Sequence, residues 1–240
     1  MAIHKLIKFG DVEMKKRLLL AFVVMCTAFS LSSYVYAQSA KTREENLLRR
    51  VKGRTLASTS TPSIRVKFGK AFKYAGSQKF TLYDKAQVEQ YYFVDADKQN
   101  RINSMLIAQF EGYLPNNNDT YNYPAAPVVS LAGQEYFANA TVMQNVSAAL
   151  KQYSDSDAAR AALFLINKGY RVGEDVLFQR FVRVVDTAKR NEFLLIYIED
   201  MNGTGFTGAD ISKGGSAESQ RDRILQALEN RALKSFEIKK

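Results

Sequence analysis

The acidic side chains of this sequence could bind a metal ion or catalyse a reaction. Asp95 and Asp97 are the first candidates for a metal site, and they lie in the stretch FVDADKQNRINSMLIAQFEGYLP. Their spacing matches the first and third ligands of a helix–loop–helix calcium site, which also needs a bidentate acid at position 12. Position 12 is Leu106, and the flanking residues alternate as strands do. We therefore predict a polar hairpin turn between two long strands, without a metal ion.

Glycoside hydrolysis is a second chemistry open to carboxylates, and it needs two of them roughly 5 to 10 Å apart across a cleft. Glu111, Glu199 and Asp200 are the candidates, each near the end of a predicted strand. Because Glu199 and Asp200 are adjacent in one strand, they point to opposite faces and make a poor pair. Solvated strand-end carboxylates are the more common case, so both interpretations stay open.

The glycine-rich stretch GTGFTG, residues 203–208, has the spacing of a dinucleotide-binding loop. That motif needs a helix directly after it and a surrounding βαβ unit. The strand before this stretch is predicted to be antiparallel, which does not fit such a unit. We interpret the stretch as a flexible loop before the last helix, and we predict no cofactor.

The N-terminal segment has the order of an export signal. Residues 15–17 are basic, an apolar run of twelve residues follows, and Val35 and Ala37 occupy the small-residue positions of a cleavage site. A membrane span needs about 20 consecutive apolar residues, so cleavage is favoured over an uncleaved anchor. We predict a signal peptide over residues 1–37, cleaved after Ala37, and a periplasmic or secreted mature protein.

Histidine and cysteine occur once each, as His4 and Cys26, both inside the segment predicted to be removed. The mature chain would then have neither imidazole nor thiol, and no disulfide could form. This excludes Ser-His-Asp and Cys-His catalysis and the usual zinc, copper and iron sites. Carboxylate or lysine chemistry, a hard cation, or no catalysis at all remain.

The formal charge of +10 is concentrated near the N-terminus. Residues 38–63 form a predicted basic polar arm and linker, whereas the rest of the chain is nearly balanced in charge. A short basic tether makes nucleic-acid binding a poor hypothesis. The arm could still contact a membrane surface peripherally.

The elements that must position these residues belong to one predicted α+β domain over residues 64–240. Apolar and polar residues alternate through its first half, as in antiparallel strands with one face in a core. We predict a curved antiparallel meander followed by a C-terminal hairpin, VLFQRFVRVVD and NEFLLIYIED. Two amphipathic helices, over residues 154–169 and from Ser216 onward, are expected to pack on one side of the sheet.

The loop GYLPNNNDTYNYPAAP, residues 112–127, is the predicted binding site. Tyrosine offers rigid contact area and asparagine adaptable hydrogen bonds, as in binding loops generally. The predicted ligand-binding residues are Tyr113, Tyr121, Asn122 and Tyr123, and truncating the tyrosines is expected to spare the fold. An ordinary connection whose aromatic rings pack on the sheet is an equally good interpretation.

The leading functional hypothesis is an exported, non-catalytic envelope or secreted protein that binds an unknown protein or small-molecule ligand. The alternative is a carboxylate-dependent hydrolase acting on polysaccharide or cell-wall material. The two need different sites. A hydrolase requires two acids that converge in a deep cleft, whereas a binding protein requires an apolar or tyrosine-lined groove.

Overall fold

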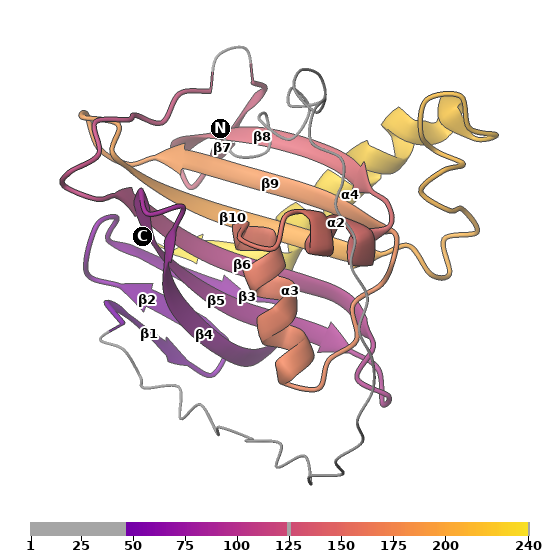
Figure 1. Ribbon diagram of the computed structural model, residues 1–240, viewed down its shortest axis with the longest axis horizontal. Helices are drawn as coiled ribbons and strands as arrows, with labels where there is room; N and C mark the ends of the chain where they lie inside the picture. Colours follow the sequence, from indigo (N-terminus) through magenta and orange to yellow (C-terminus); the bar gives the residue numbers. More distant parts are fainter. Residues whose placement is uncertain (1–46, 124–125, 240) are drawn as a thin grey trace, which may run out of the picture. The chain divides into compact units, whose positions relative to one another are not determined.

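The computed structural model describes residues 47–123 and 126–239, which belong to one folded unit. Within these residues the chain forms two antiparallel sheets and three α-helices, so the predicted α+β class is confirmed (Figure 1). The predicted signal peptide and its cleavage after Ala37 lie outside the described residues. None of the described helices is long and apolar enough to cross a membrane.

The larger sheet contains seven strands in the order β4-β5-β6-β10-β9-β8-β7. The strands are β4 (Lys73–Leu82), β5 (Ala86–Ala96), β6 (Ile102–Tyr113), β7 (Val128–Leu131), β8 (Gln134–Met143), β9 (Val176–Val184) and β10 (Asn191–Asp200). The predicted hairpin of two long apolar segments is β9 and β10. Two meanders meet where β6 pairs with β10, and this pairing places Glu111 directly opposite Glu192.

The smaller sheet has the order β1-β2-β3-β11 and joins the two ends of the folded unit. Its strands are β1 (Arg49–Lys52), β2 (Thr55–Ser58), β3 (Ile64–Phe68) and β11 (Phe236–Lys239). Strands β1 and β2 fall in the segment predicted to be an arm and linker. The folded unit therefore begins before Ile64, because these two short strands extend the sheet that β3 starts.

The helices are α2 (Val146–Gln152), α3 (Asp157–Asn167) and α4 (Arg221–Ser235), and a 3-10 turn, η1 (Glu218–Gln220), leads into α4. Helix α3 begins where the Ser156 hydroxyl accepts a hydrogen bond from the Ala159 amide at 3.1 Å. It ends before Gly169, whose positive φ of 85° suits a glycine after a helix. These local signals confirm the first of the two predicted helices.

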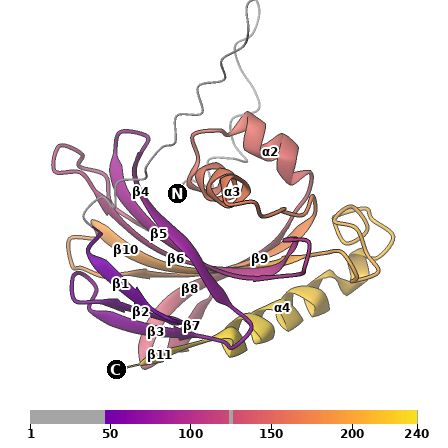
Figure 2. The same ribbon diagram turned by 90° about the horizontal axis from the view of Figure 1, so that it is seen from below.

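The two faces of the larger sheet pack against different partners (Figure 2). The sandwich face, which includes Phe93, Phe110 and Phe193, packs against the smaller sheet and α4. The α3 face, which includes Tyr92 and Ile107, packs against α3. The helices therefore cover opposite faces rather than one side. The reason is that the four neighbouring strands β5, β6, β10 and β9 have runs of consecutive buried residues, so both faces of the sheet need a cover.

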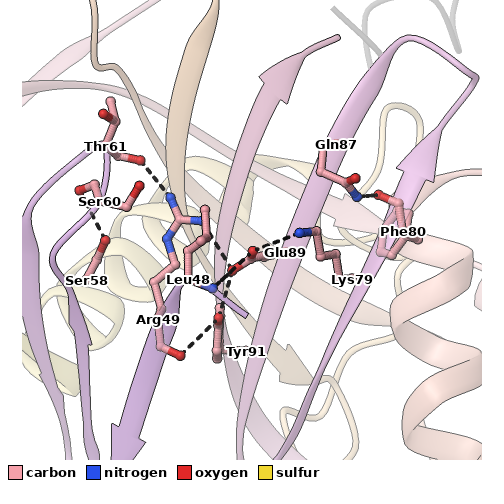
Figure 3. A network of polar contacts seen from close by, with 10 residues as sticks. All are labelled: Leu48, Arg49, Ser58, Ser60, Thr61, Lys79, Phe80, Gln87, Glu89 and Tyr91. Carbon is pink, nitrogen blue, oxygen red and sulfur yellow. Dashed lines mark hydrogen bonds and ion pairs between the residues drawn. The ribbon is translucent and has the colours of Figure 1, made fainter. Parts of the chain in front are cut away.

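Glu89 fixes strand β1 to the sandwich face (Figure 3). This carboxylate is only 2 % exposed, and it forms ion pairs with Arg49 at 3.2 Å and Lys79 at 3.7 Å. It also accepts hydrogen bonds from the Tyr91 hydroxyl at 2.8 Å and the Leu48 amide at 3.3 Å. Arg49, expected in a solvated arm, is thus the buried partner of a core carboxylate.

Candidate functional site

The tyrosines of the predicted binding loop point inward, onto two acids of the larger sheet. Tyr121 is only 4 % exposed, and its hydroxyl donates to Glu111 Oε1 at 2.9 Å. The Tyr123 hydroxyl donates to Glu192 Oε2 in a short hydrogen bond. Tyr113 stacks on Tyr121 with ring centroids 4.3 Å apart. These rings pack on the sheet, which agrees with the interpretation of the loop as an ordinary connection.

Of the four predicted ligand-binding residues, only Asn122 is exposed, and it lies between Tyr121 and Tyr123 in the chain. The buried position of Tyr121 reverses the expectation that its truncation would spare the fold. Removing a buried aromatic ring leaves a cavity that the surroundings fill only in part. Whether the loop binds a ligand stays a prediction, and Asn122 is the side chain that it offers to solvent.

Glu111 on β6 and Glu192 on β10 are cross-strand partners, so their side chains leave the sheet side by side on the α3 face. Burial raises the pKa of Glu111 from 4.5 to about 7, and the negative charge of Asp157 adds to the effect. Burial also raises the pKa of Glu192 to about 8, with a contribution from the charge of Glu111. Two like charges this close resist joint ionisation, so the pair holds a proton at neutral pH.

The hydrogen bonds to this acid pair come from neutral donors, and the charge of Arg180 only partly offsets the rise in the pKa of Glu192. Gln109 donates to Glu111 Oε2 at 2.9 Å and to Asp157 Oδ2, on the first residue of α3, at 3.1 Å. The Arg180 guanidinium lies 5.8 Å from the Tyr123 ring centroid. In the described part of the chain, no lysine or arginine is within ion-pair distance of Glu111 or Glu192.

A carboxyl group with a pKa near 7 is suited to general acid–base catalysis. Glu111 and Glu192 meet that condition, but both already accept hydrogen bonds from tyrosine hydroxyls. The Tyr121 hydroxyl occupies one oxygen of Glu111 and the Tyr123 hydroxyl one oxygen of Glu192, so a substrate would have to compete with the loop for these carboxyl groups. In this conformation the two acids, the two tyrosine hydroxyls and Gln109 form one hydrogen-bonded cluster.

The other acids named as candidates do not join Glu111. Glu199 accepts hydrogen bonds from the Arg231 guanidinium at 2.7 Å, and Asp200 pairs with Arg101 at 2.7 Å. The true neighbour of Glu111 is Glu192, which the sequence argument did not single out. Its only signal was a charged residue directly before the apolar run FLLIYI.

The stretch that resembles a calcium loop forms the β5–β6 hairpin turn, as predicted. Asp97 Oδ1 accepts hydrogen bonds from the amides of Gln99 and Arg101, both at 2.8 Å. Asn100 takes the left-handed conformation, with φ of 60°. Across residues 47–123 and 126–239, no group of three or more Asp, Glu, His or Cys side chains could hold a metal ion.

A hollow of about 350 Å³ lies between the start of β9, the segment that follows β10, and α4. We call it the α4 hollow. Its apolar lining comes from Leu177, Met201, Phe206, Ile224 and Ala227, and its polar lining from Thr204, Arg223 and Arg231. The glycine-rich loop supplies part of one wall. Since α4 begins only at Arg221, that loop does not have the strand–loop–helix geometry of a dinucleotide site.

The described residues thus contain two candidate sites of different kinds. The acid pair has perturbed carboxyl groups but is covered by its tyrosines, whereas the α4 hollow is open but has no reactive group. No protein-family model, no curated protein and no solved structure matches this chain.

Proposed function

We propose that the protein is an exported, non-catalytic binding protein whose ligand occupies the α4 hollow. The observation that supports this most is the hollow itself, which is mainly apolar and carries a few polar side chains. Small-ligand sites usually have this composition and measure roughly 300–1,000 Å³. The acid pair supports the same proposal, because tyrosine hydroxyls of the chain itself already bond to both carboxyl groups.

Export rests on the signal-peptide pattern of residues 1–37. We expect the mature protein in the periplasmic or secreted fraction of the native host, with Gln38 as its first residue. N-terminal sequencing of the protein from each fraction measures this directly. Recovery of the full-length chain from the cytosol would contradict export.

Ligand binding is tested by loading the purified mature protein with an envelope extract of the native host. Mass spectrometry then identifies the small molecules that stay bound after washing. We expect a molecule retained by the natural protein and lost from Ala227→Phe, because the larger ring fills the hollow. If the natural protein and the variant retain the same molecules, or none, the hollow is not the ligand site.

A carboxylate-dependent hydrolase of polysaccharide or cell-wall material is the second candidate, favoured by the side-by-side Glu111 and Glu192 with raised pKa values. It requires the tyrosine loop to open. The test is release of soluble sugar from purified cell wall. If the natural protein releases sugar and either Glu111→Gln or Glu192→Gln abolishes the release, this candidate replaces the first.

A further inference from the structure

The inner wall of the α4 hollow is one side of α4. Arg223, Ala227 and Arg231 are spaced four residues apart, so they lie in a row along one face of the helix. Both ends of the row are long and charged, and the middle residue is small. Ile224 stands beside this row and adds to the apolar lining. The helix therefore provides an apolar recess with a cation at each end.

The two arginines differ in what they already bind. Arg231 donates to both carboxylate oxygens of Glu199, from Nε at 2.7 Å and from Nη2 at 2.7 Å. Arg223 donates to the neutral side chain of Gln220 at 2.8 Å. Within the described residues, no carboxylate lies at ion-pair distance from Arg223. Arg223 is thus the lining cation whose charge is not matched by the protein.

We infer that the α4 hollow binds an amphipathic anion with a single acyl chain, a long-chain carboxylate in its simplest form. The chain lies against the apolar lining, and the carboxylate pairs with Arg223, whose guanidinium fork matches a carboxylate in two parallel hydrogen bonds. The volume of about 350 Å³ is at the small end of ligand sites, which suits one chain better than two. This inference deepens the proposed function and rests on it.

The test measures binding of dodecanoate to the mature protein by calorimetry. Dodecyltrimethylammonium, which has the same chain and the opposite charge, is the matched control ligand. We expect dodecanoate to bind and the cation to bind at least about tenfold more weakly, because a charge-assisted pair contributes at this level. Arg223→Gln should weaken dodecanoate binding by a similar factor, whereas Lys234→Gln, on an exposed part of the same helix, should leave it unchanged.

Ala227→Phe should abolish binding of dodecanoate. Should that variant fold poorly, amide chemical-shift mapping on the natural protein gives the same information, with shifts expected in residues 201–206 and 223–231. Equal binding of both ligands, or no effect of Arg223→Gln, would overturn the anion assignment and leave an apolar ligand site intact. If neither ligand binds but an extract molecule is retained in the hollow, the ligand class is wrong and the binding function stands.

Discussion

One acid on the sandwich face of the larger sheet and two acids on its α3 face have different partners. On the sandwich face, Glu89 is neutralised by two cations, Arg49 and Lys79 (Figure 3). On the α3 face, Glu111 and Glu192 have only hydroxyl and amide donors at hydrogen-bond distance, and their raised pKa values favour the protonated state.

The comparison shows two ways to bury a carboxyl group. A carboxylate with cations beside it joins distant segments through ion pairs, as Glu89 does for β1. An acid pair without a cation must take up a proton, and its contribution to stability then depends on pH. Buried acids with strongly shifted pKa values often belong to functional sites. Glu111 and Glu192 therefore remain the candidate site of the alternative function, carboxylate-dependent hydrolysis.

The largest expected effect comes from removing a cation from the sandwich face. Arg49→Met keeps an apolar chain over the Phe110 ring, which the guanidinium now covers at 4.0 Å, but leaves Glu89 with one cation. We expect the free energy of unfolding to fall by about 3–5 kcal/mol, the usual cost of breaking a buried pair. Urea denaturation measures it.

Arg50→Met is the matched control, because Arg50 is the exposed neighbour in the same strand. It should change the free energy of unfolding by less than about 0.5 kcal/mol. Equal losses in the two variants would mean that the ion pair with Glu89 has no special role.

The second prediction concerns pH. The folded-state pKa values of Glu111 and Glu192, about 7 and about 8, exceed the ordinary 4.5. Between pH 4.5 and 8 the folded chain therefore holds protons that the unfolded chain has lost. The stability from these acids is fully present below pH 4.5 and is lost as pH rises through 7 and 8. For Glu111 alone this amounts to about 3 kcal/mol, from 1.36 kcal/mol per pKa unit.

Urea denaturation at several pH values measures this decline. The double variant Glu111→Gln with Glu192→Gln should lose less stability over the same window, since neither side chain can ionise. Glu89→Gln, the matched control on the sandwich face, should be less stable throughout because it leaves two cations without their carboxylate. A double variant with the same pH dependence as the natural protein would show that the pair does not hold the proton.

A smaller effect is expected from the tyrosine hydroxyls. Tyr121→Phe keeps the ring that stacks on Tyr113 but removes the donor to Glu111. We expect a loss of about 1–2 kcal/mol, measured by thermal or urea denaturation at pH 6. Tyr83→Phe, at a ring that is 51 % exposed, is the control and should change little. An unchanged Tyr121→Phe would mean that the hydroxyl does not hold the loop.

The smallest effect should come from the exposed ion pair between Asp119, in the same loop, and Lys85, in the turn between β4 and β5. Lys85 and Asp119 are 2.9 Å apart, and each side chain is about half exposed. Lys85→Ala should lower the free energy of unfolding by about 0.2–1 kcal/mol, and added salt should reduce the difference. A larger loss than in Tyr121→Phe would reverse the view that the buried tyrosines, rather than surface charges, anchor the loop.

Local features of this protein could be predicted from the sequence. Alternation of apolar and polar residues identifies strands such as β3, because side chains in a strand point to opposite faces in turn. A short continuous apolar run identifies β10, because a strand buried on both faces has no polar side. Asp97 marks the β5–β6 turn, since its carboxylate can bond to amides two and four residues further on. Ser156 and Gly169 mark the ends of α3 for similar reasons, because a cap involves only neighbouring residues.

Only the tertiary structure decided which residues meet. Glu111 and Glu192 become partners because β6 pairs with β10 in one register, and a shift of one residue would send them to different faces. Arg49 becomes a core residue because Glu89, far along the chain, lies opposite β1. The tyrosines turn inward because the acids accept their hydroxyls. Each depends on strand pairing between distant segments, and hydrophobic periodicity carries no information about which strands pair.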